Sequence, residues 1–114
     1  MDALEAALPH TITGPAIRSG NELVLPFAEA QRAVGLASEH RIAVLGVEAF
    51  RILEDGLGVE TYSGYGFSFD GNWPAYVRVN NDAALSFMAA NTMGTGYGYI
   101  LTATAEEEFN HLQT

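Results

Sequence analysis

The chain has 114 residues, which is the length of one domain, and it is 48% apolar and 11% aromatic, which is the composition of a packed core and not of a disordered chain. It has no cysteine, which excludes disulfides and thiol chemistry and fits a reducing compartment. Its 14 acidic and 5 basic residues give a formal net charge of −9, which disfavours nucleic acid and anionic membranes as partners.

The first quarter of the chain predicts only short elements. Residues 3 to 8, ALEAAL, are typical of a short helix with Asp2 as its cap and Pro9 as its end. Residues 10 to 21 predict a loop around a short extended piece, and NELVLP predicts a brief strand. We interpret residues 1–25 as an N-terminal extension of a single domain whose core spans about 26–112.

Two longer helices are predicted. Pro26 suits the first turn of a helix over 27–39, and Asn72 can cap a second helix from about 73 to 90. Apolar residues recur at helical spacing in both segments: Phe27, Ala30, Val34 and Ala37 in the first, and Trp73, Tyr76, Val77, Ala84, Phe87 and Met88 in the second.

Three segments predict the main strands. Residues 41–53 are apolar at both odd and even positions, which indicates a central strand that is covered on both faces. In residues 59–70 the side chains of the two faces alternate in character, and a turn at 54–58 would join the two segments as an antiparallel hairpin. Residues 97–104 predict another strand, followed by a short helix carrying Phe109 and Leu112 inward. The expected fold is therefore α+β: a small, mostly antiparallel sheet of about four strands, two main helices and a short C-terminal helix.

Glycines recur at period two in and beside two of these strands. Gly64 and Gly66 would lie on the same face of their strand, and Gly94, Gly96 and Gly98 would lie on the same face of the next. Such a pattern clears one strand face of side chains. The cleared strip would be filled either by the protein itself, through a helix or a ring such as Trp73, or by an outside partner or ligand.

Asn80 and Asn81 are unusual inside a helix, because a buried amide needs hydrogen-bond partners. One amide could tie the helix to a strand end, or the pair could contact a ligand. The structural role is favoured, because buried amides usually bond within the fold.

No catalytic, metal or cofactor residues are predicted. His10, His40 and His111 do not form a metal-ligand pair, and no G-x-S-x-G motif occurs. The Glu106–Glu108 run suits a helix N-terminus. No run reaches the length of a membrane helix, and acidic residues stand where a signal peptide needs basic ones, so we expect a cytoplasmic protein.

The acidic residues gather around the predicted hairpin and its exit, where tyrosines lie among them. Aromatic side chains anchor interfaces and charges steer them, so this combination suits a cationic protein partner. Solubility alone is the plainer explanation of the charge. The candidate partner-binding residues are Glu48, Glu54, Asp55, Glu60, Tyr62, Tyr65 and Asp70.

Four segments together resemble a family of small immunity proteins from bacterial polymorphic-toxin systems. They are IAVLGVEAFRI, YSGYGF, WPAYVRVNNDAALSFM and GYILTATAEEEF, and the likeness covers roughly residues 26 to 112. The resemblance implies a single α+β domain that binds a cognate toxin and blocks it, without a cofactor or catalytic turnover. It implies no particular binding residues.

Three hypotheses follow. The leading one is a toxin-neutralising protein whose acidic hairpin covers a basic active site, such as that of a nuclease. The alternative is a small-molecule-binding or enzymatic domain that uses the glycine-rich strand face and the amides of Asn80 and Asn81. The third is a homo-oligomer in which the aromatic-rich strand pairs across a two-fold axis.

Overall fold

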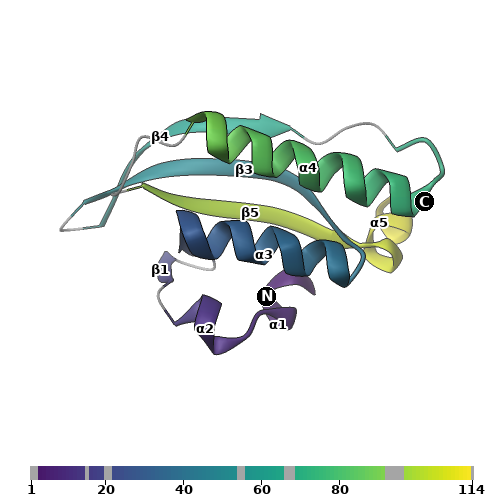
Figure 1. Ribbon diagram of the computed structural model, residues 1–114, viewed down its shortest axis with the longest axis horizontal. Helices are drawn as coiled ribbons and strands as arrows, with labels where there is room; N and C mark the ends of the chain where they lie inside the picture. Colours follow the sequence, from purple (N-terminus) through teal and green to yellow (C-terminus); the bar gives the residue numbers. More distant parts are fainter. Residues whose placement is uncertain are drawn as a thin grey trace.

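The computed structural model of the protein describes residues 3–14, 16–19, 22–53, 56–65, 69–91 and 97–113 (Figure 1). The elements follow one another as α1 (Ala3–Ala7), α2 (His10–Thr13), β1 (Ile17–Ser19), β2 (Glu22–Pro26), α3 (Phe27–Glu39), β3 (Ile42–Leu53), β4 (Gly56–Tyr65), α4 (Trp73–Asn91), β5 (Tyr97–Ala105) and α5 (Glu106–Gln113). Both predicted main helices are confirmed, α3 with the bounds expected from its pattern.

The strands form one antiparallel sheet in the order β1-β2-β5-β3-β4. Three strands are long, and β3 lies between β5 and β4. Because β4 and β5 are both antiparallel to β3, they run parallel to each other, and α4 forms the crossover between them. The predicted α+β class is therefore confirmed. The strand number differs from the predicted four, because the short β1 and β2 extend the sheet beyond β5.

The β3–β4 hairpin exists, but β4 lies earlier in the chain than the alternation over 59–70 predicts. It begins at Gly56 and ends at Tyr65. Register shifts occur between Ala49 and Phe50 and between Phe50 and Ile52. An extra residue at a β-bulge moves the following side chains to the other face of the strand, so sequence alternation cannot be extended through it.

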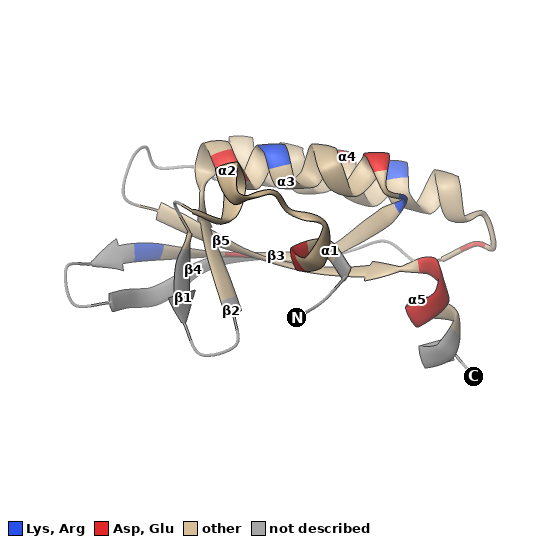
Figure 2. Ribbon diagram, turned by 90° about the horizontal axis from the view of Figure 1, so that it is seen from below, with Lys and Arg blue, Asp and Glu red and all other residues tan. Residues whose placement is uncertain are grey.

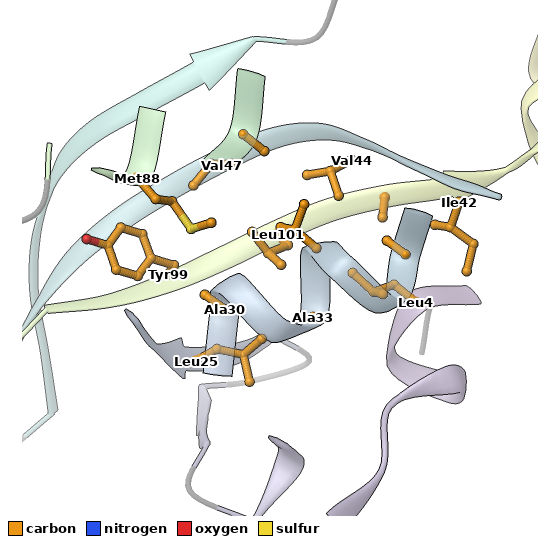
Figure 3. Close-up of a cluster of buried hydrophobic side chains, with 14 of the residues drawn as sticks. Leu4, Leu25, Ala30, Ala33, Ile42, Val44, Val47, Met88, Tyr99 and Leu101 are labelled. Atoms are coloured by element: carbon orange, nitrogen blue, oxygen red, sulfur yellow. The ribbon is translucent and has the colours of Figure 1, made fainter. Parts of the chain in front are cut away.

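Helices α3 and α4 pack side by side on one face of the sheet (Figures 1 and 2). Their predicted apolar stripes point into the core, where Figure 3 shows Ala30, Ala33 and Met88 facing Val47, Tyr99 and Leu101 from the strands. Burial of this apolar surface is the main source of the stability of the fold.

The N-terminal segment also contributes to this core. Leu4 on α1 is 3% exposed and Ile12 on α2 is 2% exposed, and both belong to the same buried cluster as the residues of α3 and the sheet. The segment expected as an extension is therefore packed onto the domain (Figure 3).

A second, aromatic cluster lies at the N-terminal end of α4. The rings of Trp73 and Tyr76 pack against Phe109 of α5 with centroid distances of 5.5 and 5.4 Å. Phe69, which precedes α4, contacts all three rings. Phe109 thus points inward as predicted and fixes α5 to the start of α4.

Among the described residues, no helix combines the length and the apolar character needed to cross a membrane.

Candidate functional site

Asn81 joins α4 to β3 and α3. Its Oδ1 accepts a hydrogen bond from the Val44 N–H (2.8 Å), and its Nδ2 donates to the Ile42 carbonyl (3.0 Å) and to Ser38 Oγ (2.9 Å). The side chain is 1% exposed. The predicted structural role of an asparagine amide is confirmed for this residue, and its amide groups are committed to the fold.

The bonds of Asn81 reproduce those of a neighbouring strand. Among the described residues, the pairing of β3 with β4 stops at Gly46, so the groups of Ile42 and Val44 on that side lie outside this ladder. One amide that accepts from residue 44 and donates to residue 42 makes the same pair of bonds as the C=O and N–H of a single residue in an adjacent parallel strand. Asn81 therefore caps the edge of β3 where β4 stops.

A β-bulge in β3 lies directly beside this anchor. Between Val44 and Gly46 the register with β5 shifts, which leaves Leu45 as the extra residue. Bulges locally break the ladder and are frequent next to functional sites. In this protein the bulge forms one wall of a pocket.

The pocket lies between the bulge and α4 and has a volume of about 170 Å³. Cavities of about 150 Å³ with apolar walls can hold a molecule of the size of benzene. Apolar side chains and small residues supply most of the lining. The lining residues are Val44, Leu45, Gly46, Val47, Asn80, Ala83, Ala84 and Phe87.

Asn80 is the polar side chain in this lining. It is 2% exposed, and its Nδ2 donates to the Tyr76 carbonyl one turn earlier (2.8 Å). The sequence indicated Asn80 and Asn81 as a pair, but the structure separates their surroundings: Asn81 faces the start of β3, and Asn80 lies at the pocket.

Two of the seven predicted partner-binding residues, Glu48 and Asp70, lie in different regions of the molecule. Glu48 lies in the middle of β3 and is half-buried, whereas Asp70 is exposed at the start of α4, where it accepts a hydrogen bond from the Asn72 N–H (3.1 Å). Glu54 and Asp55 lie outside the described residues. Figure 1 shows that β3 and β4 reach away from the end of the molecule that holds the start of α4.

Three of the seven occupy known positions in the β4 backbone. Glu60 lies opposite Phe50, Tyr62 opposite Ala49 and Tyr65 opposite Gly46. These positions follow one another along the last strand of the sheet. Their side chains lie outside the part of the structure that is described.

The structure places three further carboxylates near Asp70. Phe69 and Phe109 have ring centroids 5.1 Å apart, so the residues beside them in the chain lie at the same end of the molecule (Figure 2). Glu106, Glu107 and Glu108 are exposed in the first turn of α5. We name Asp70 and Glu106–Glu108 the acidic end. The sequence separates Asp70 from α5 by three dozen residues, so only the aromatic contacts reveal this group.

Trp73 lies at the opposite end of β3 from Gly98, so its ring does not cover that glycine. Its Nε1 donates to the Arg41 carbonyl (2.8 Å), and its ring belongs to the aromatic cluster. Gly98 lies at the opposite end of the sheet, at the start of β5, paired with Phe50 and Pro26. Gly66, Gly94 and Gly96 lie outside the described residues.

Two tyrosines have unusual surroundings. Burial among the aromatic rings raises the pKa of Tyr76 above its ordinary value of 10.0, because it disfavours the charged form. Tyr99 is fully buried beside Phe27 and Met88, and its hydroxyl has no hydrogen-bond partner among the described atoms (Figure 3).

Within the described ranges, no group of three or more histidine, aspartate or glutamate residues is placed to hold a metal ion. His10 lies on α2 and His40 at the end of α3, and the side chain of His111 is not among those described.

The pocket-lining residues are the part of the site that the sequence does not reveal. Ala83 and Ala84 are common helix residues, and Gly46 lies in a strand without a turn signal. The bulge at Leu45 is a tertiary feature, set by the pairing of β3 with β5. Asn80 was the one detectable signal.

Comparisons with protein-family models, with curated proteins and with solved structures gave no significant match to this chain.

Proposed function

We propose that the protein is an immunity protein that binds and neutralises a cognate bacterial toxin domain through its acidic surface. The observation that carries this proposal is the formal charge of −9 together with the exposed carboxylates of the acidic end. A toxin that acts on nucleic acid needs a positive surface to hold its substrate. A strongly acidic protein is complementary to such a surface.

The carboxylates of the acidic end remain available to a partner. Within the part of the chain that is described, none of Asp70 and Glu106–Glu108 forms an ion pair. Exposed charges of one sign raise the potential over a surface and speed association with an oppositely charged protein. The acidic end would therefore steer a basic toxin domain toward this end of the molecule.

The direct test uses the neighbouring gene. An immunity protein is expected beside a gene for a large secreted protein with a variable C-terminal domain. The isolated C-terminal domain should be captured by this protein in a pull-down, and co-expression of the two should restore growth of cells that the domain alone kills. Absence of capture and of rescue would contradict the proposal.

A matched pair of variants locates the contact. Asp70→Lys and Asp82→Lys change the net charge equally, and both positions are exposed. Asp70 belongs to the acidic end, whereas Asp82 lies within α4. We expect Asp70→Lys to weaken capture of the toxin domain and Asp82→Lys to leave it nearly unchanged. Equal effects would mean that net charge, not this surface, is what matters.

The pocket between β3 and α4 favours a second candidate, a domain that binds a small molecule. It has apolar walls with the amide of Asn80 beside them, which is the usual composition of a ligand site. Its volume limits the ligand to about the size of benzene with one hydrogen-bonding group.

This second candidate is tested by NMR titration with phenol and with benzamide. We expect shift changes at Gly46 and Ala83, and their loss in Ala83→Leu, which fills the pocket. Ala90→Leu, at an exposed position of the same helix, is the control. If the chemical shifts of Gly46 and Ala83 do not change at saturating concentrations of either compound, the second candidate is wrong.

A further inference from the structure

Within the described ranges, two stretches of strand edge lack a partner strand and are covered by other parts of the chain. At the start of β3, Asn81 takes the place of a strand. Along β5, the pairing with β2 is limited to Tyr99 and Gly98, and α1 packs beside the remainder of β5. Native proteins cover or interrupt such edges because unpaired peptide groups bind other chains.

The outer edge of β4 is different. This strand is last in the sheet order and has 10 residues, about twice the usual length of a strand. It pairs with β3 on one side, and none of the described segments pairs with it on the other. Its sequence, GLGVETYSGY, has one charged residue and neither lysine nor proline, which are the residues that commonly protect an edge.

We propose that the outer edge of β4 receives an extended strand of a basic protein partner, so that the partner continues the sheet. This inference rests on the proposed function, because the partner is the toxin domain. In strand addition the main-chain hydrogen bonds supply affinity, and the side chains supply specificity. Glu60 and the negative charge of the chain would set that specificity.

The negative charge of Glu60 and of the whole chain favours a basic strand as the occupant. Glu60 is the charged residue within β4, and the chain as a whole carries a formal charge of −9. An arginine- or lysine-bearing strand would therefore meet Glu60 and would approach a protein of opposite net charge. Opposite charges across a strand pair stabilise it, and like charges destabilise it.

The same charges disfavour a second copy of this chain. Antiparallel pairing of two β4 strands about their midpoint brings the two Glu60 positions close together. Each copy also carries a formal charge of −9. Both effects oppose edge-to-edge dimers, so the edge remains open to a partner of opposite charge.

Adjacent proline substitutions test the proposal. The register between Tyr62 and Tyr65 is continuous, and successive strand residues direct their N–H groups to opposite sides. Proline has no N–H. One of Ser63→Pro and Gly64→Pro therefore removes a hydrogen bond to β3, and the other removes an N–H that points away from β3 toward the outer edge. We expect the variant that loses the outward N–H to keep the wild-type circular dichroism and melting temperature but to bind the toxin domain at least tenfold more weakly. Wild-type affinity in the folded proline variant would overturn strand addition while leaving the proposed function intact.

Amide hydrogen exchange supplies an independent measurement that holds even if both proline variants unfold. Alternate amides of β4 should exchange quickly in the free protein and become protected when the toxin domain is added. Binding without new protection in β4 would overturn strand addition alone, and no binding at all would overturn both proposals. Protection of β4 in the free protein together with a dimeric mass by light scattering would show that a second copy occupies the edge.

Discussion

Asn81 shows how one side chain replaces an element that the fold does not supply. The peptide groups of Ile42 and Val44 on the α4 side of β3 lie beyond the end of β4, and they are buried. Buried peptide groups without partners are costly. The amide carries both a donor and an acceptor, so it satisfies both groups at once.

Replacement of Asn81 by leucine is expected to destabilise the protein by about 3 kcal/mol, because it leaves a buried N–H and a buried C=O unpaired. Urea denaturation measures the change in the free energy of unfolding. Asp82→Ala on the exposed side of the same helix should change stability by less than about 0.5 kcal/mol. An Asn81→Leu variant as stable as the wild type would show that the three hydrogen bonds contribute little.

Tyr99 provides the converse case. Its buried hydroxyl lacks a partner among the described atoms. Removal of this hydroxyl should therefore break no hydrogen bond, whereas removal of the hydroxyl from most buried tyrosines breaks one. We expect Tyr99→Phe to be neutral or to stabilise the fold by up to about 1 kcal/mol. Thermal and urea unfolding measure this, with Tyr97→Phe at a half-buried position as the comparison. A loss of stability in Tyr99→Phe would indicate a hydrogen bond at this hydroxyl.

Tyr76 predicts a loss of stability at high pH. Burial raises its pKa in the folded state above 10.0, so the unfolded chain ionises first as the pH rises. The unfolded state then binds fewer protons, and the free energy of unfolding falls above pH 10 until the folded tyrosine also ionises. Urea midpoints measured from about pH 8 to about pH 11 should fall less steeply in Tyr76→Phe than in the wild type. Identical slopes would contradict the raised pKa.

At the scale of elements, the segments with one strong pattern were predicted well. The stripe of α3 and the cap of α4 were both found: the Asn72 Oδ1 accepts from the Ala75 N–H (3.0 Å). These features depend on residues close in sequence. The bounds of β4 were wrong because they depend on bulges, which are set by the pairing with β3 and not by β4 itself.

The covering of β5 by α1 gives a prediction at this scale. Leu4 anchors α1 in the core, and Leu4→Asp would place a charge there and release the helix. The freed edge of β5 should then pair with other molecules, so light scattering should detect concentration-dependent association. Ala6→Asp, at an exposed position of α1, should show the same light scattering as the wild type. A strictly monomeric Leu4→Asp variant that keeps its fold would show that α1 does not protect the edge.

At the scale of the whole molecule, the α+β class followed from the sequence, but the arrangement of the site did not. The order of strands decides which edge stays open, and the contact of Phe69 with Phe109 brings Asp70 to α5. Both are relations between distant parts of the chain, which a single sequence does not encode in local patterns. Of the candidate residues, Glu48 and Asp70 therefore lie in different regions although both lie around the predicted hairpin.

The surplus of negative charge is the property on which the proposed function depends. If it steers a basic toxin domain, association should be fast at low salt and should slow as salt screens the charges. Charge reversal in Glu60→Lys or Asp70→Lys should slow association further, whereas dissociation should change less. Asp82→Lys again serves as the control with equal net charge.

The most direct measurement is the association rate constant with the toxin domain, determined by stopped flow over a series of salt concentrations. The rate constant of the wild type should fall by about tenfold or more between low and high salt, and Glu60→Lys and Asp70→Lys should lie below it at low salt. A rate constant that is indifferent to salt and to both substitutions would contradict docking through the acidic surface.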